Sequence, residues 1–180
     1  MRYRRDRTSG ATYFFTVVTW QRKTWFADVD NVARLRAALR EVRARHPFLI
    51  DAMVVLPDHL HCLWTLPPDD DNYPMRWNRV KGVFTRSLPE VGTRGSSSHE
   101  KPERRERAVW QRRYWEHRVR DDDDFARHCD YIHWNPVKHG LVQRAADWPH
   151  SSFSRFVAAG IYPQDWGIAD NGLLDFPSGE

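Results

Sequence analysis

Three short apolar runs in the first half of the chain are separated by longer segments in which apolar residues recur every three or four positions. The short runs are rich in β-branched and aromatic residues, which is typical of strands. The periodic segments are typical of amphipathic helices. The pattern therefore predicts strands at 12–20, 48–56 and 59–66 and helices at 30–45 and 75–88. Because only Pro57 and Asp58 separate the second and third strands, these two strands are expected to form a hairpin.

The second half of the chain begins with a polar stretch. Residues 89–107 are rich in Gly, Ser, Pro and charged residues, so we expect a loop there. Residues 109–119 predict a fourth strand. The acidic run at 121–124 favours a helix N-terminus through the helix dipole. Since Pro136 disfavours helical geometry at the residue before it, this helix is expected to end near Asn135.

The predicted elements follow the order β-α-β-β-α-β, then a helix, with a last short helix around 151–159. This order is typical of an α+β fold of the ferredoxin-like type, an antiparallel sheet with helices on one face. The helix after the fourth strand is then an added C-terminal element beyond that core.

Size and composition fit one domain outside membranes. The chain has 180 residues, of which 41% are hydrophobic, enough for one substantial core. No apolar run approaches the roughly 20 residues that span a bilayer, and the N-terminus has no apolar signal core. The two cysteines, Cys62 and Cys129, make no disulfide framework, which fits a reducing cytoplasm.

The net charge is only +4, but the positive charges are clustered. The segment MRYRRDR holds four arginines and one aspartate, and residues 101–120 hold eight Lys or Arg and three Glu. Guanidinium groups fork onto phosphate oxygens, and exposed aromatic rings among arginines suit unpaired bases. A solvated charged face is the alternative. Candidate phosphate contacts are Arg4, Arg5, Arg112, Arg113 and Lys138, and candidate stacking residues are Trp115 and Trp134.

The predicted third strand opens with HLH, at His59 and His61. Side chains alternate along a strand, so the two imidazoles share a face and can converge on one ion, while Leu60 and Cys62 face the other way. Two histidines are an incomplete ligand set, so a further ligand is needed elsewhere. Ordinary hydrogen bonding of both rings is the alternative.

A second motif, YIHWNPVKHGLV, starts on the last long helix. Tyr131 and Asn135 are four residues apart and therefore share a helix face. The amide oxygen of Asn135 is a candidate third ligand for a hard ion such as Mg²⁺ or Mn²⁺, with Tyr131 one turn away. The alternative is a half-buried aromatic and a helix-terminal asparagine before proline.

Taken together, these motifs resemble a known family. His-hydrophobic-His on a strand, with a tyrosine on a later helix, resembles the HUH superfamily of single-strand DNA nucleases. The segments HPFLIDAMVVLPDHLHCLWTLP, VWQRRYWEHRVRDDDDFARHCDYIHWNPVKHGLV and DWPHSSFSRFV resemble, more closely, the REP-associated tyrosine transposases, bacterial relatives of single-tyrosine insertion-sequence transposases. The resemblance covers about 8–163, which implies one HUH transposase-like domain at 1–163 and a tail at 164–180.

The resemblance implies a role for each of four residues. His59 and His61 match the family's metal-binding pair, Tyr131 its nucleophile and Asn135 the residue that completes the site. The implied activity is cleavage and rejoining of single-stranded DNA near REP hairpins, through a 5′-phosphotyrosine link and with Mg²⁺ or Mn²⁺. The family also implies a protein that is monomeric and acts in the bacterial cytoplasm, at the nucleoid.

Two other functions are open. One is a host-adopted hairpin-binding protein that has lost transposition. The other is a plasmid nickase of the wider superfamily, against which the lack of a second tyrosine near Tyr131 counts. Among nearby polar residues, Asp58 is expected to serve the turn, with orientation of an imidazole as the alternative. His117 and His128 are expected to be structural.

Overall fold

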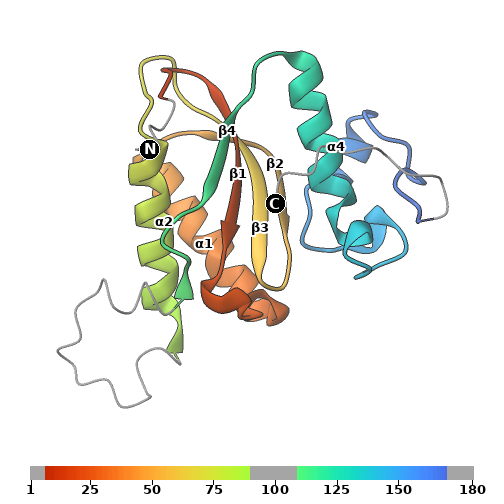
Figure 1. The fold of residues 1–180 in the computed structure, drawn as a ribbon, viewed down its shortest axis with the longest axis horizontal. Helices are drawn as coiled ribbons and strands as arrows, with labels where there is room; N and C mark the ends of the chain where they lie inside the picture. Colours follow the sequence, from red (N-terminus) through yellow and green to blue (C-terminus); the bar gives the residue numbers. More distant parts are fainter. Residues whose placement is uncertain (1–6, 90–108, 170–180) are drawn as a thin grey trace.

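The computed structural model describes residues 7–89 and 109–169. Four strands form one antiparallel sheet in the order β2-β3-β1-β4 (Figure 1). Their bounds are Thr12–Val18 for β1, Leu49–Val55 for β2, His59–Thr65 for β3 and Trp115–Arg118 for β4. In this order β3 lies between β1 and β2, and β1 lies between β3 and β4, as in a ferredoxin-like sheet. The predicted α+β, ferredoxin-like fold is confirmed.

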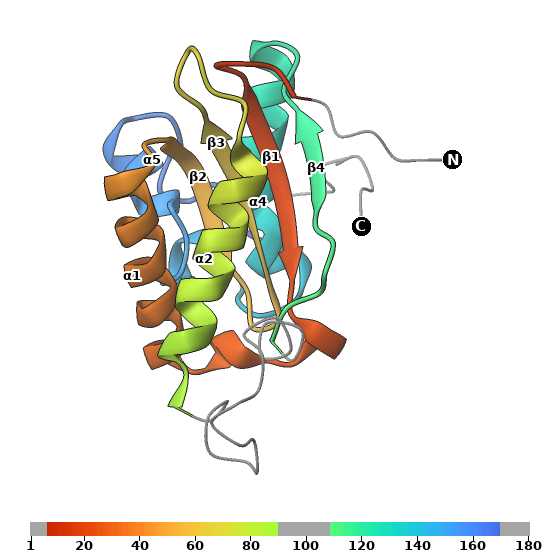
Figure 2. The same ribbon diagram turned by 90° about the vertical axis from the view of Figure 1, so that its left-hand side faces the viewer.

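Helices cover both faces of the sheet. α1 (Val29–Arg45) and α2 (Tyr73–Ser87) lie together on one face, and α4 (Asp122–Lys138) lies across the other, so α4 is the predicted addition to the core (Figures 1 and 2). The short α5 (Phe153–Ala158) lies on the α4 side. Three 3-10 turns complete the described elements: η1 (Trp20–Arg22), η2 (Trp25–Ala27) and η4 (Ala145–Asp147).

Alternation along the strands divides the apolar interior into two cores. On β1, Phe15 belongs to the core beneath α1 and α2, whereas its neighbour Phe14 belongs to the core beneath α4. On β3, Leu60 and Cys62 belong to the first core, as predicted. The alternate β3 positions therefore face α4, which is where the two histidines lie.

The fourth strand is shorter than the predicted 109–119, because the segment before Trp115 leaves the sheet. Trp110 forms only an isolated bridge with Thr19. The N–H of Gln111 still donates to the Val18 carbonyl at 3.0 Å. The Gln111 carbonyl, however, accepts from Lys81 of α2 at 2.9 Å. The backbone of Gln111 thus bonds to β1 on one side and to α2 on the other. Regular pairing of β4 with β1 begins only at Trp115.

The prediction that the last long helix ends near Asn135 was wrong, because α4 continues through Pro136 to Lys138. Its end is set by Gly140, which has a φ of 66°. The Gly140 N–H donates to the Val137 carbonyl and the Leu141 N–H to the Pro136 carbonyl, each at 2.9 Å. These two bonds form a glycine C-cap of the Schellman type. The local preference of the residue before proline is thus outweighed by burial of the last turn and by this cap.

The described part of the predicted tail packs against the body of the protein. The Trp166 and Tyr162 rings stack with centroids 4.4 Å apart, and the Ala169 N–H donates to the Gln143 carbonyl at 3.0 Å. The boundary at 163 remains a prediction. Residues 90–107 of the predicted 89–107 loop, and Arg4 and Arg5, lie outside the described residues. No helix in the described ranges is both long and apolar enough to cross a bilayer.

Candidate active site

β3 places His59 and His61 side by side on the face that α4 covers. Their ring centroids lie 4.9 Å apart, and the two side chains are almost completely buried, at 3% and 0% exposure. The predicted shared face is therefore present. Burial of two imidazoles is costly unless their polar atoms have partners, so the partners of each nitrogen decide what the pair does.

One nitrogen of each ring is held by a neighbour. The Nδ1 of His61 lies 2.9 Å from the Thr16 hydroxyl on β1, and the Nδ1 of His59 lies 2.6 Å from an Asp58 carboxylate oxygen. The other carboxylate oxygen of Asp58 accepts from Arg22 at 3.2 Å. Asp58 thus serves the turn, as predicted, and also orients an imidazole, which was the alternative role. Such partners fix ring orientation and tautomer in metal sites.

The second nitrogen of each ring has no hydrogen-bond partner in the part of the chain that the structure describes. The Nε2 atoms of His59 and His61 are buried without a hydrogen bond to any described residue. Burial lowers the pKa of both imidazoles, that of His61 well below its ordinary value, although Asp58 opposes this shift at His59. Both rings are therefore neutral near pH 7, the form that binds a metal ion.

α4 brings the other predicted site residues to the same place. The Tyr131 ring lies 5.1 Å from the His61 ring, in an edge-to-face arrangement. The Lys138 ammonium lies 5.0 Å from the centroid of the Tyr131 ring. Asn135 is fully buried, and both polar atoms of its amide lack a partner among the described residues.

His139 was not singled out from the sequence, but it belongs to the site. Its ring lies 5.3 Å from that of His59. Tyr131 and His139 thus contact the two ends of the histidine pair, and Asn135 lies between them, one helical turn from each. This places Asn135 opposite the pair. The signal was present in the YIHWNPVKHGLV motif, since His139 follows Asn135 by four residues.

The donor atoms fit a divalent ion. Two neutral imidazole nitrogens and one amide oxygen are available, all buried and all without partners within residues 7–89 and 109–169. Nitrogen and oxygen donors of this kind hold first-row divalent ions, and three protein ligands leave positions for substrate oxygens. The residues that would hold the ion are His59, His61 and Asn135.

The predicted DNA-contacting residues are more widely spread over the molecule than the predicted metal ligands. Trp115 is 44% exposed on the edge strand β4, and its ring lies 5.6 Å from that of Phe14, which lies 5.5 Å from His61. Trp115 thus presents an exposed ring near the histidine pair. Arg112 and Arg113 are exposed in the segment before β4. Trp134 packs against the core beneath α4.

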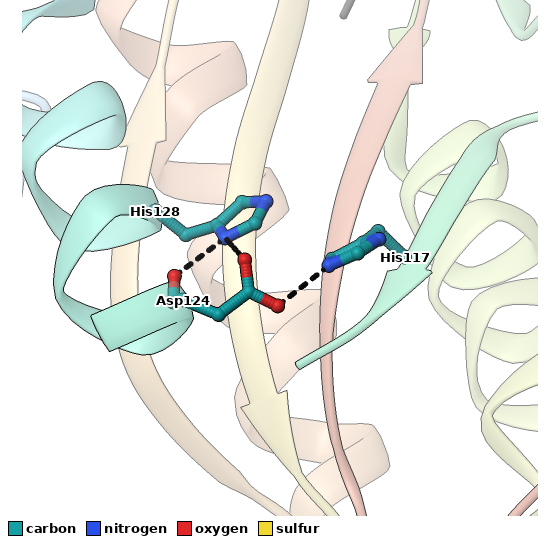
Figure 3. A group of neighbouring side chains, drawn as sticks. All are labelled: His117, Asp124 and His128. Atoms are coloured by element: carbon teal, nitrogen blue, oxygen red, sulfur yellow. Dashed lines mark hydrogen bonds and ion pairs between the residues drawn. The ribbon is translucent and has the colours of Figure 1, made fainter. Parts of the chain in front are cut away.

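A second group of polar side chains ties β4 to the first turns of α4 (Figure 3). An Asp124 carboxylate oxygen lies 2.8 Å from the Nε2 of His117 and accepts from the Arg120 side chain at 3.2 Å. The Nδ1 of His128 lies 2.7 Å from the Asp124 carbonyl. The potential ligand atoms of His117, Asp124 and His128 lie within 4.8 Å of one another. Burial raises the pKa of Asp124, but its hydrogen bonds outweigh this and hold the pKa well below the usual range.

Other contacts fix the middle of α4. The buried His133 lies 2.7 Å from the Ser152 hydroxyl through its Nε2, and Ser152 also accepts from the Met53 N–H of β2 at 2.9 Å. The Tyr162 hydroxyl donates to Asp130 at 2.6 Å. His133 thus points away from Tyr131, as predicted from its place on the helix.

This arrangement of fold and site is matched by known proteins. Residues 7–135 match the model of a family described as "Transposase IS200 like", a range that includes both histidines, Tyr131 and Asn135. The match covers more than half of the chain. The chain therefore belongs to the IS200-like transposase family.

Within that family, the chain is similar to one group of proteins in particular. A Haemophilus influenzae protein whose name places it among the REP-associated tyrosine transposases is 48% identical over 166 residues, 92% of each chain. The REP-associated tyrosine transposase of Escherichia coli K12 is 41% identical over 178 residues, 99% of this chain and 96% of the relative. A solved structure described as a REP-associated tyrosine transposase bound to a REP hairpin is 40% identical, with a TM-score of 0.81, and covers 100% of this chain and 97% of its own. The resemblance inferred from the sequence is confirmed.

Proposed function

We propose that the protein is a metal-dependent, single-tyrosine endonuclease and strand transferase that acts on single-stranded DNA at REP-type hairpins. The observation that carries this proposal is a set of buried polar atoms on His59, His61 and Asn135, beside the ring of Tyr131, that have no partner among the residues described by the structure. Unsatisfied buried polar atoms are rare in folded proteins and call for a ligand or a role. An ion together with a phosphate group supplies partners for all of them.

Tyr131 supplies the nucleophile. Its hydroxyl oxygen forms a bond to phosphorus while the bond from phosphorus to the 3′ oxygen breaks. The hydroxyl proton passes to solvent and the 3′ oxygen takes one up, which leaves a 5′-phosphotyrosine and a free 3′-OH. Attack by a 3′-OH on the phosphotyrosine reverses these changes and rejoins a strand, so no ATP is needed.

Other residues bind and orient. A divalent ion, Mg²⁺ or Mn²⁺, held by His59, His61 and Asn135 would neutralise charge on the scissile phosphate. Lys138, whose ammonium lies 5.0 Å from the Tyr131 ring centroid, brings positive charge to the same phosphate. Asp58 and Thr16 keep the two imidazoles oriented.

The proposed substrate is the chemical class named for the related structure, a REP hairpin. The exposed ring of Trp115 is proposed to stack on an unpaired base next to the cleaved bond. Arg4, Arg5, Arg112 and Arg113 are proposed to contact phosphates, which makes binding weaken with salt. We expect a monomer that acts in the cytoplasm, at the nucleoid, and the mass in solution by light scattering tests the monomer.

The test is covalent capture. The protein is mixed with a hairpin oligonucleotide that carries a single-stranded flank, with Mn²⁺, and separated on a denaturing gel. We expect a protein–DNA adduct with the wild type and with the control Tyr114→Phe, and none with Tyr131→Phe, which still binds the hairpin. An adduct from Tyr131→Phe would exclude this nucleophile. Absence of any adduct with the wild type, with binding kept, would favour the host-adopted hairpin-binding protein.

A further inference from the structure

The face of the molecule opposite the candidate active site carries a basic groove. α1 and α2 lie side by side on that face, and the sheet separates them from α4 (Figures 1 and 2). Between the two helices is a groove of about 390 Å³. Its charged and titratable lining consists of Glu41, Arg45 and His46 from the α1 side and Arg79 and Arg86 from α2.

The cations of this groove are poorly neutralised. Glu41 and Arg45 form a loose pair at 3.8 Å, with both side chains well exposed. Arg79 and Arg86 are exposed, and neither forms an ion pair with any described residue. Among the described residues, Arg79 donates a hydrogen bond only to the weakly accepting sulfur of Met75, at 3.0 Å. Between Tyr73 and Ser87 the sequence of α2 holds no acidic residue.

Two inward-facing cations of the same helix show the contrast. Arg76 is buried and binds the Asp70 carboxylate at 2.8 Å. Lys81 is buried and donates to the Gln111 carbonyl at 2.9 Å. α2 therefore satisfies the cations that the fold needs and leaves Arg79 and Arg86 facing solvent in the groove. The contacts that stabilise the fold therefore do not explain the presence of Arg79 and Arg86.

The spacing of the groove arginines suits a phosphate backbone. Arg79 and Arg86 are seven residues apart on one helix, which is two turns or about 10 Å. Gly82 lies between them, and a Cβ there would approach Arg86 Nη1 to 3.1 Å, so the glycine leaves room for the guanidinium along the helix. Phosphates along one strand of a duplex follow at about 3.4 Å of helix axis. If α2 runs along the duplex axis, the two arginines are therefore about three phosphate steps apart.

We propose that the α1–α2 groove binds the phosphate backbone of double-stranded DNA, as a second contact surface on the face opposite Tyr131. The planar guanidinium fork binds phosphate oxygens in pairs, which favours phosphate over a diffuse acidic surface. The groove reads no bases and adds sequence-independent affinity. The proposal rests on the proposed function only in naming DNA as the polymer.

The test compares two double variants that remove equal charge. Arg79→Gln/Arg86→Gln removes the groove cations, and Arg36→Gln/Arg40→Gln removes two exposed α1 cations that do not line the groove. Affinity for a hairpin oligonucleotide with a long stem is measured by fluorescence anisotropy over a range of salt. Adduct formation with a short unpaired strand is measured in parallel.

For the groove variant we expect at least a tenfold loss of affinity for the long hairpin. The slope of log affinity against log salt should fall by about 1.8, since each lost phosphate contact on duplex DNA contributes about 0.9. Its adduct yield on the short strand should equal that of the wild type. The control variant should change affinity less than threefold.

Two outcomes would overturn the groove proposal: equal losses of hairpin affinity for the two variants, or unchanged hairpin affinity of the groove variant. If the wild type forms no adduct while the groove variant still loses hairpin affinity, the groove stands and the proposed cleavage fails. The two proposals are thereby tested separately.

Discussion

The protein has two groups of histidines around α4, and they differ in what their polar atoms touch. In the pair on β3, His59 and His61 each have one nitrogen held by a neighbour and one buried nitrogen that no described residue contacts by a hydrogen bond. In the group formed by His117, Asp124 and His128, the atoms that face one another are already joined by hydrogen bonds and ion pairs (Figure 3). Both groups have the residue types of a metal site.

This difference in hydrogen bonding suggests different roles: the first group can accept a ligand, whereas the second group is a structural contact. Filling the first group satisfies atoms that otherwise remain unpaired in the interior. Filling the second requires an ion to displace Arg120 from Asp124 and the His128 ring from a backbone carbonyl. We therefore propose that the first group is the one that binds a metal ion. The second group is assigned to holding the start of α4 against β4. Residue type and proximity alone do not distinguish the two.

The largest expected effect contrasts the two groups directly. His61→Ala should abolish Mn²⁺ binding in isothermal titration calorimetry. It should lower adduct yield by more than the about 100-fold that losing an orienting partner costs. His117→Ala should keep Mn²⁺ binding with the wild-type stoichiometry. Loss of the ion from His117→Ala, with His61→Ala unaffected, would reverse the assignment.

The next effect concerns the carboxylate behind the pair. Asp58→Asn should lower Mn²⁺ affinity by about 10–100-fold, because Asp58 orients the His59 ring through a 2.6 Å contact. Asp69→Asn, an exposed carboxylate in the loop before α2, serves as the control. Equal Mn²⁺ affinity in Asp58→Asn and the wild type would return Asp58 to the role of a turn residue.

The second group should show its effect in stability. Asp124→Asn should lower the free energy of unfolding by about 2 kcal/mol, because His117 and Arg120 lose a buried, charged acceptor. Urea denaturation measures this, with Asp123→Asn, exposed on the same helical turn, as the control. Mn²⁺ affinity should not change. A variant as stable as the wild type would mean that the contacts around Asp124 do not hold α4.

The last effect builds up gradually with acid, as a dependence of stability on pH. Burial lowers the pKa of His133 to about 3, whereas an unfolded histidine has a pKa of about 6.5. Between these values the unfolded chain binds a proton that the folded chain excludes. Stability is therefore intact above about pH 6.5 and falls as the pH drops, by at most about 1.4 kcal/mol per pH unit for this group.

The matching experiment is denaturation of His133→Gln between pH 7 and pH 4. Its stability should fall less steeply with acid than that of the wild type. His46→Gln, at a partly exposed histidine at the end of α1, should keep the wild-type slope. Parallel slopes for the wild type and His133→Gln would show that His133 does not contribute.

The sequence predicted the sheet well, because its strands are specified by local alternation. Phe14 and Phe15, adjacent on β1, enter opposite cores as period-two alternation requires. The end of α4 could not be predicted locally, since burial and the cap at Gly140 outweigh the preference before Pro136. The break before β4 depends on Lys81, which is distant in sequence from Gln111.

The candidate site was predictable only in part. The shared face of His59 and His61 follows from strand geometry, and the shared face of Tyr131 and Asn135 follows from helix geometry. That the strand pair and the helix pair lie close together could be predicted only from the resemblance to a known family. The contact of His139 with His59 was missed because it depends on α4 continuing past Pro136.

The attachment of α4 at several points has a mechanical consequence. Its start is tied to β4 through Asp124, its middle to β2 through Ser152, and its end is closed at Gly140. Because the helix is held at several points, Tyr131 is expected to keep a fixed position relative to the sheet. We expect the captured 5′ end to stay where it was cut while the joining 3′ end travels to it. Energy transfer between labels on α4 and β2 should then stay constant through cleavage, and a change would show that the helix itself carries the strand.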